Sequence, residues 1–434
     1  MIASPTALSR RAFVTGGLAL AGGLALAPRL ALARTASWPG VAQVVANYVG
    51  KGRVAGAVAA MGLGQAAPDF IAQGVRTLGQ TGTVDADSLF RIYSMTKPIT
   101  GMATMLLVED GKLGLDQPLA DILPAFAQMQ VQRVPDGRLD DLVPAERPIT
   151  IRHLLTHTAG LGYSFIQKGP IKTAYSQAGL VPGAISRLPL PLPGFSRSGS
   201  IPSLAVFAQR LARLPLVYQP GTKWSYSVSL DLLGHVIEVV SGQPFDHFLL
   251  ERLLGPLGMD STWFQVPRNE VQRLTTNYGV LEGLLLPIDP ARASVYLDPA
   301  AAPFGGSGLV SSPRDYDRFL RMLLGGGELD GARILKPETV ALATSNLLPP
   351  GVGTAGTMAN GGGYGAGGRV GLGREAGTFG WGGAAGTIGF ADLKRGWRGA
   401  FYAQFMPAEA WPLQSDFPEI AMRDAMAHTG LQES

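Results

Sequence analysis

Residues 91–98 read Arg-Ile-Tyr-Ser-Met-Thr-Lys-Pro and join an extended, β-prone approach to a helical run that ends near Asp110. Apolar residues recur at helical spacing after Ser94, and Gly111 is a suitable helix stop. The pattern predicts that Ser94 lies at or beside a helix N-terminus, where unpaired backbone N–H groups stabilise negative charge. Lys97 follows three residues later and therefore shares a helix face with Ser94.

A Ser-x-x-Lys pair can combine a nucleophile with its own base, because burial of an ammonium group disfavours its charged form. The plainer interpretation of Ser94 and Lys97 is a serine N-cap followed by a solvated lysine. Among the eight lysines of the chain, only Lys97 has a serine three positions earlier. The rest of the chain must decide between the two interpretations.

The composition favours one large domain or two with ample core, since 46% of the 434 residues are hydrophobic and 16% are charged. The 58 glycines and 32 prolines indicate many turns, and the absence of cysteine excludes disulfides and thiolate zinc sites. Residues 1–33 hold three arginines and no acid, so removing them lowers the net charge from +4 to +1. Charge therefore gives no reason to expect a nucleic acid partner.

The N-terminus has the features of an export signal. Arg10 and Arg11 precede an apolar run, Val14–Ala27, and a small-residue Ala-x-Ala site ends the segment at position 33. This order predicts that residues 1–33 are a twin-arginine signal peptide and that the mature protein is periplasmic or secreted. A membrane anchor is the alternative, but the run is shorter than the roughly 20 residues of a span. We expect no membrane span after cleavage.

Hydrophobic periodicity changes along the chain. Helices are predicted over 41–49 (with Gly50 as its stop), from just after Ser94 to about 110, and over 151–156, 204–214, 228–241, 245–254, 312–324 and 417–428. Strands are predicted over 54–63, 69–75, 364–372, 378–381, 387–393 and 399–406. The Pro-, Gly- and Ser-rich stretch 169–203 is predicted to be a long ordered loop or a flap beside a site. The order predicts an α/β (α+β) fold with an antiparallel sheet domain from 40–115 and 295–434, and a mainly helical inserted domain, 116–294.

Several segments then carry a resemblance. They are Ser94-Met-Thr-Lys97, Ile149-Thr-Ile-Arg-His-Leu-Leu-Thr-His-Thr-Ala-Gly-Leu161, Leu254-Gly-Pro-Leu-Gly-Met-Asp-Ser-Thr-Trp263 and Gly306-Ser-Gly-Leu-Val-Ser-Ser-Pro313. Over roughly residues 41–406 the chain resembles the serine β-lactamase and penicillin-binding superfamily, in its class C-like branch, and is most similar to the family VIII carboxylesterases. The resemblance implies a β-lactamase/transpeptidase-like fold, with the sheet flanked by helices.

The resemblance assigns roles to two further stretches. Tyr226, in Trp-Ser-Tyr-Ser-Val, would relay the proton of Ser94 together with Lys97. Val228 stands where the β-lactamases have an asparagine. Gly-Trp-Gly-Gly-Ala at 380–384 stands where they have Lys-Thr-Gly, so the carboxylate-binding charge is missing and an apolar tryptophan replaces it.

The same stretch implies the oxyanion hole. The backbone N–H groups of Ser94 and Ala384 would form it, with Gly382 and Gly383 permitting close approach and Trp381 as an apolar wall. A strand glycine pair at a bulge is the structural alternative.

These residues favour an exported serine carboxylesterase that acts on a small-molecule ester or amide without a cofactor or metal. A β-lactamase, D-aminopeptidase or DD-peptidase of the same fold stays open, and so does a non-catalytic module that binds an acyl group or peptide. The Gly351–Gly356 pattern fits G-x-G-x-x-G but no helix follows it, so a dinucleotide site is not expected. His153 and His157 lack an acidic partner for a metal site, and helix-surface or buried hydrogen-bonding roles suit them better.

Overall fold

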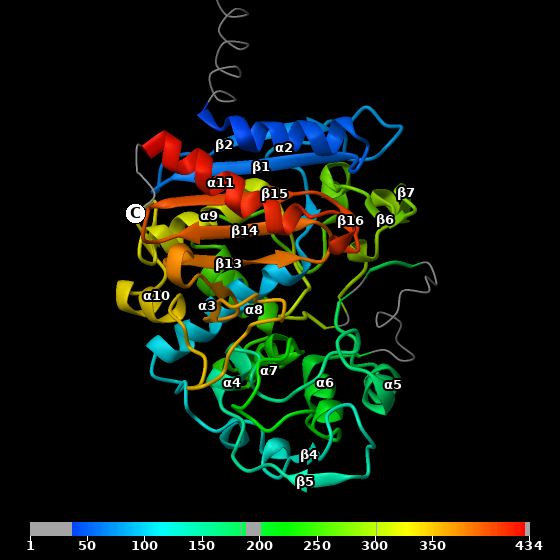
Figure 1. The fold of residues 1–434 in the computed structure, drawn as a ribbon, viewed down its shortest axis with the longest axis vertical. Helices are drawn as coiled ribbons and strands as arrows, with labels where there is room; N and C mark the ends of the chain where they lie inside the picture. Colours follow the sequence, from blue (N-terminus) through cyan, green and yellow to red (C-terminus); the bar gives the residue numbers. More distant parts are fainter. Residues whose placement is uncertain (1–36, 184, 188–200, 301, 430–434) are drawn as a thin grey trace, which may run out of the picture.

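A large antiparallel sheet forms the upper half of the molecule in Figure 1. The computed structural model describes residues 37–183, 185–187, 201–300 and 302–429. In spatial order the strands are β11 (Gly363–Tyr364), β12 (Arg369–Val370), β13 (Thr378–Gly383), β14 (Thr387–Asp392), β15 (Trp397–Tyr402), β1 (Gly56–Leu63) and β2 (Asp69–Gly74). N-terminal and C-terminal segments meet where β1 pairs with β15, which confirms the predicted fold class.

Helices cover both faces of the sheet, and β1 is consequently buried along almost its whole length. On one face α2 (Pro39–Gly50) and α11 (Leu413–Thr429) pack against each other and against β1 and β15 (Figure 1). On the other face α9 (Pro313–Leu324) packs against β14 and β15. Ser312 caps α9 as its sequence predicts, because its hydroxyl accepts the N–H of Asp315.

The lower half is mainly helical, and α3 (Thr96–Glu109) runs through its centre. The other helices are α4 (Ile151–Leu155), α5 (Gly169–Gln177), α6 (Leu204–Leu211), α7 (Ser229–Ser241), α8 (Phe245–Leu249) with a π-helical turn (Leu250–Leu254), and α10 (Pro337–Ala343). Every residue of α3 from Thr96 to Leu107 is buried, as expected of a helix surrounded by other elements. The serine turn at its N-terminus therefore lies between the two halves.

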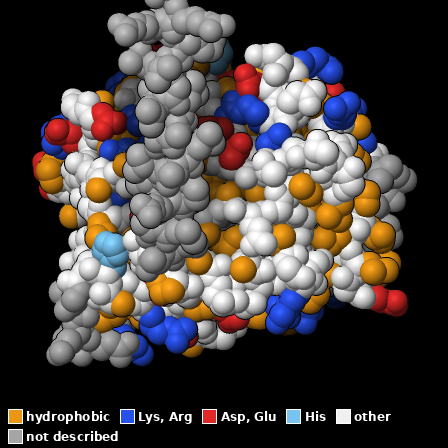
Figure 2. Space-filling model, turned by 90° about the horizontal axis from the view of Figure 1, so that it is seen from above, with side chains coloured by type: hydrophobic (Ala, Val, Ile, Leu, Met, Phe, Trp, Pro, Cys, Tyr) orange, Lys and Arg blue, Asp and Glu red, His pale blue; other side chains and the backbone are white. Residues whose placement is uncertain are grey.

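Short strand pairs complete the fold. They are β3 (Phe90–Arg91) with β8 (Val310–Ser311), β4 (Gln130–Gln132) with β5 (Leu142–Pro144), β9 (Glu328–Leu329) with β10 (Ala332–Arg333), and the hairpin of β6 (Asn277–Leu281) and β7 (Leu284–Asp289), whose β6 also pairs with β16 (Phe405–Met406). The hairpin was not predicted. Its leucines at 281, 284 and 286 are exposed, and hydrophobic side chains gather in Figure 2 on the side where Figure 1 places β6 and β7.

Three local predictions are wrong. Gly169–Gln177 forms helix α5 instead of loop, because Pro170 opens it and apolar side chains four residues apart are buried on one face. Residues 364–372 form a hairpin of two-residue strands, with a positive-φ glycine at 367, rather than one strand. Gly50 lies inside α2, and Gly52, with φ +66°, takes the left-handed position after the helix.

The predicted signal peptide, residues 1–33, lies outside the described residues, so export stays a prediction. The boundaries of the two predicted domains also stay predictions. Within the described part of the chain, no helix is both long and apolar enough to cross a membrane.

Candidate active site

Ser94 lies in a 3-10 turn, Tyr93–Met95, that leads directly into α3. This confirms its predicted place beside a helix N-terminus. Tyr93 adopts φ +41°, a conformation that costs energy for a tyrosine and occurs mostly at functional sites. Tyr93 is buried, whereas Ser94 is partly exposed and lines the main cavity.

The structure brings the three predicted catalytic side chains together. The Tyr226 hydroxyl donates to Ser94 Oγ at 2.7 Å, and Lys97 Nζ donates to the same oxygen at 3.2 Å. Lys97 is completely buried, and its Nζ also lies 4.6 Å from the centre of the Tyr226 ring. A nucleophile and two proton-carrying groups are thus within direct reach of one another.

A buried aspartate behind Lys97 was not predicted. Lys97 Nζ donates to the Gly306 carbonyl at 2.6 Å, and the Gly306 N–H donates to Asp231 Oδ1 at 2.8 Å. Burial raises the pKa of Asp231 to about 6, although the positive charge of Lys97 opposes the rise. A Cβ at Gly306 would come within 2.5 Å of Asp231 Oδ2, so only glycine fits there. The one sequence signal that could have pointed to this group was Asp231 itself, an acidic residue within the mostly apolar pattern of α7.

The strand β13 forms the facing wall of the site and packs against the serine turn. A Cβ on Gly383 would lie 2.3 Å from the Ile92 carbonyl, so this glycine lets the strand pack closely on the serine turn. A Cβ on Gly382 would instead meet the side-chain amide of Gln414 at 2.7 Å. Ala384, which follows β13, lines the same cavity as Ser94.

Trp381 is more than the apolar wall that was predicted. Its indole Nε1 donates to the Tyr226 hydroxyl oxygen at 3.2 Å, and the two ring centres are 5.7 Å apart. Trp381 therefore supports the group that would take the proton of Ser94.

Of the two roles left open for His153 and His157, helix-surface or buried hydrogen bonding, the structure shows the buried one. His157 Nδ1 bonds the Ser227 hydroxyl at 2.9 Å, and its ring centre lies 4.8 Å from that of Tyr226. Burial, with a smaller contribution from Lys97, holds the pKa of His157 well below its usual value. His153 Nδ1 accepts the Thr150 N–H at 3.2 Å in a capping box at the start of α4. Among the described residues, no three metal-ligating His, Cys, Asp or Glu side chains are clustered.

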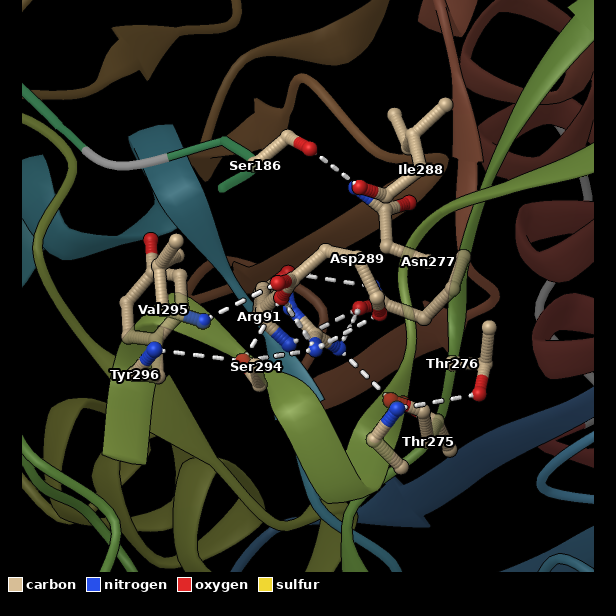
Figure 3. A network of polar contacts seen from close by, with 12 residues as sticks. Arg91, Ser186, Thr275, Thr276, Asn277, Ile288, Asp289, Ser294, Val295 and Tyr296 are labelled. Carbon is tan, nitrogen blue, oxygen red and sulfur yellow. Dashed lines mark hydrogen bonds and ion pairs between the residues drawn. The ribbon is translucent and has the colours of Figure 1, made fainter. Parts of the chain in front are cut away.

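A second buried cation precedes the nucleophile (Figure 3). Arg91 Nε donates to Asp289 Oδ2 at 2.7 Å, and the guanidinium also bonds the Thr275 carbonyl at 2.7 Å and the Ser294 hydroxyl at 3.0 Å. Arg91 is fully buried, and Asp289 is nearly so. The network ties β3 to β7 and fixes the approach of the chain to Ser94.

The cavity has a volume of about 590 Å³, and Ser94 is among the residues that line it. Tyr163 and Phe165 line it near Tyr226, and the Tyr163 ring stacks on the Tyr226 ring with centres 5.7 Å apart. Arg369 and Glu375, which form an ion pair, line another part of it. A cavity of this size and lining suits a small molecule with apolar groups.

Comparison with known proteins identifies the family. The family model described as Beta-lactamase matches residues 41–417. The chain belongs to the Beta-lactamase family. Esterase EstB of Burkholderia gladioli is 31% identical over 363 residues, which are 78% of this chain and 82% of EstB.

Two further comparisons extend the family assignment. A Mycobacterium tuberculosis protein described as uncharacterized is 39% identical over 275 residues, and the match spans 63% of this chain and only 63% of that protein. The solved structure of EstCE1, "a hydrolase with promiscuous acyltransferase activity", superposes with a TM-score of 0.72 at 26% identity and covers 91% of this chain and 99% of its own. These similarities show the β-lactamase fold and relatives that act on acyl groups.

Proposed function

We propose that this Beta-lactamase family protein is an exported serine carboxylesterase. The observation that carries the proposal is the contact of the Tyr226 hydroxyl with Ser94 Oγ at 2.7 Å, beside Lys97 Nζ at 3.2 Å. The esterase named among its relatives supports the same chemistry. Export rests on the twin arginines and the apolar run within residues 1–33.

The reaction follows from this geometry. Ser94 Oγ attacks the ester carbonyl carbon, and its proton passes to the Tyr226–Lys97 pair. The N–H groups of Ser94 and Ala384 stabilise the oxyanion that forms. The ester C–O bond then breaks, and the alcohol leaves with the relayed proton. Water attacks the acyl-enzyme by the same route in reverse, which releases the acid and restores the Ser94 hydroxyl.

Two residues favour an ester over a β-lactam. Val228 and Trp381 occupy the places where the resemblance would require an amide and an ammonium group. Without these groups, a free carboxylate and an acylamino side chain on the substrate lose their polar partners. The acyl-transfer residues do not depend on either position, so slow β-lactam hydrolysis is compatible with the site.

Acyl transfer to an alcohol is the second candidate function. The cavity that Ser94 lines has a volume of about 590 Å³, and EstCE1 is described as having acyltransferase activity. An alcohol bound where water attacks would form a new ester and return the same proton to Ser94. Adding a primary alcohol during ester hydrolysis and measuring the ester-to-acid product ratio tests this candidate.

The main test is hydrolysis of p-nitrophenyl butyrate by the purified mature protein and by Ser94→Ala. We expect the substitution to lower kcat/KM by about a thousandfold or more, because the nucleophile works as part of a unit. Near-normal turnover by Ser94→Ala would exclude the mechanism. Faster hydrolysis of a chromogenic cephalosporin than of any ester would favour a β-lactamase, and failure of a fluorophosphonate probe to label Ser94 would favour a binding module.

Export has its own test. Replacing the Arg10–Arg11 pair by two lysines should keep the protein inside the cell, because twin-arginine transport depends on that pair. Secretion of the double-lysine variant at the normal level would contradict this route.

A further inference from the structure

Gln414 lies in the first turn of α11, against the face of β13 that points away from the serine turn, and it also lines the cavity. Its Nε2 donates to the Gly383 carbonyl at 2.7 Å and to the Thr387 carbonyl at 2.9 Å. Both acceptors are carbonyl oxygens, so only the amide nitrogen of the side chain can face them. These two carbonyls lie at the two ends of the turn that joins β13 to β14, and Ala384 lies in that turn.

The strand is shaped to accept this side chain. A Cβ on Gly382 would lie 2.7 Å from Gln414 Nε2 and 2.9 Å from its Cδ, closer than such atoms approach. A residue with a side chain at position 382 would therefore displace the amide. The glycine that sequence patterns assign to substrate approach makes room instead for a residue of the C-terminal helix.

The turn is held from its other side by the serine turn and the end of the sheet. The Gly383 backbone packs closely on the Ile92 carbonyl, and the Phe405 N–H donates to the Ala385 carbonyl at 3.1 Å. Gln414 supplies the opposing contact. Without it, the two carbonyls at the ends of the turn lose their shared donor and the turn gains freedom to move.

We propose that Gln414 is a positioning residue that holds the Ala384 N–H where the oxyanion forms. The inference rests on the proposed esterase function. Oxyanion stabilisation depends on donors that are already in place when charge develops, and a misplacement of about 1 Å at a reacting centre can cost up to about a hundredfold in rate. Gln414 acts through the backbone of the turn and needs no contact with the substrate.

The test is Gln414→Met, which keeps the length of the side chain and removes both donors. We expect kcat for p-nitrophenyl butyrate to fall about tenfold with KM within about twofold of the wild type, because the donor matters only when the oxyanion forms. Affinity for a phenylboronic acid, which gives a tetrahedral adduct with the serine, should fall by the same factor. Fluorophosphonate titration of Ser94 counts the folded enzyme in each preparation.

Gln414→Glu separates positioning from packing. Its carboxylate would face two carbonyl oxygens, so kcat should fall further than in Gln414→Met at pH 8. Its protonated form can donate one hydrogen bond, so the ratio of mutant to wild-type kcat should rise as the pH falls through the pKa of the new carboxyl group. A purely structural role predicts a constant ratio.

Gln219→Met is the matched control, because Gln219 Nε2 also donates to a backbone carbonyl, that of Pro144 at 3.2 Å, but lies outside the cavity lining. It should keep normal kcat. Wild-type kcat and boronate affinity in both Gln414 variants would overturn the proposal, and so would a change confined to KM. Failure of the esterase function itself would be seen separately, as full activity in Ser94→Ala.

Discussion

Two buried cations flank the nucleophile, and the protein surrounds them in opposite ways. Arg91, three residues before Ser94, bonds a carboxylate, a carbonyl and a hydroxyl, and its ion pair with Asp289 is almost inaccessible to water. Lys97, three residues after Ser94, bonds one carbonyl and the serine hydroxyl. Among the described residues, no carboxylate lies within ion-pair distance of Lys97.

The difference separates structure from chemistry. A buried charge whose donors are all used is fixed in one state and can only hold its neighbours in place. A buried charge with incomplete pairing can exchange a proton with a neighbour at little cost, which is typical of functional sites. The comparison therefore predicts that removing Lys97 mainly affects turnover and that removing Arg91 mainly affects stability.

The largest expected effect is that of Lys97→Met on turnover. Loss of the group that shares the Ser94 proton should lower kcat/KM by about a hundredfold to ten-thousandfold, since general acid–base groups contribute that much. The free energy of unfolding should not fall in proportion, because Lys97 forms no direct ion pair among the described residues and acts on Asp231 only at longer range. Ester hydrolysis and urea unfolding measure the two effects. Lys223→Met, at an exposed lysine, is the control, and equal losses of rate in both variants would remove Lys97 from the mechanism.

Arg91→Met should have the next largest effect, on stability. Asp289 would remain as a buried charge without its cation, and breaking such a pair costs about 3–5 kcal/mol of unfolding free energy. Urea unfolding measures the loss. The double variant Arg91→Met, Asp289→Asn should recover part of it, because the uncompensated charge is gone. A single variant within about 1 kcal/mol of the wild type would contradict a structural role for the pair.

The buried carboxyl group behind Lys97 predicts a pH-dependent effect. Folding raises the pKa of Asp231 from 3.8 to about 6, so the folded state binds this proton more tightly. The resulting stability is fully present below pH 3.8 and is lost as the pH rises through about 6, by about 3 kcal/mol in total. Asp231→Asn should remove this slope. The unfolding free energy of the variant minus that of the wild type should therefore increase between pH 4.5 and pH 7.5. An unchanged slope in urea unfolding would show that Asp231 is ionised throughout.

The side chains proposed to be catalytic were easier to predict than the atoms that hold them. Ser94 and Lys97 are linked by helical spacing, which is local, and Tyr226 was found through a resemblance of its stretch. The Gly306 stretch carried part of the resemblance, but the contact of its carbonyl with Lys97 depends on tertiary packing and could not be predicted from it. Gln414 acts through backbone carbonyls and left no pattern in the sequence.

The same physical reason explains the strengths and errors of the fold prediction. Strands β13 and β14 and helix α9 have clear periodicity and caps, and they were predicted within a few residues. The β6–β7 hairpin was missed because its leucines at 281, 284 and 286 face outward and break the usual link between hydrophobicity and burial. The two-residue strands β11, β12 and β16 are too short for a period to be visible.

The smallest expected effect concerns the hydrogen bond from Trp381 to Tyr226. Trp381→Phe keeps an aromatic ring beside Tyr226 but removes the indole donor, 3.2 Å from the phenol oxygen. A net hydrogen bond contributes about 0.5–1.5 kcal/mol, so kcat should fall by about twofold to tenfold with little change in KM. Stopped-flow measurement of p-nitrophenol release isolates the acylation step in which the phenol takes the proton.

Trp224→Phe is the matched control. This buried tryptophan also packs near Tyr226, with ring centres 6.2 Å apart, and its Nε1 donates no hydrogen bond among the described residues. If both variants slow acylation equally, aromatic packing rather than the indole donor supports Tyr226, and Trp381 returns to the role of an apolar wall.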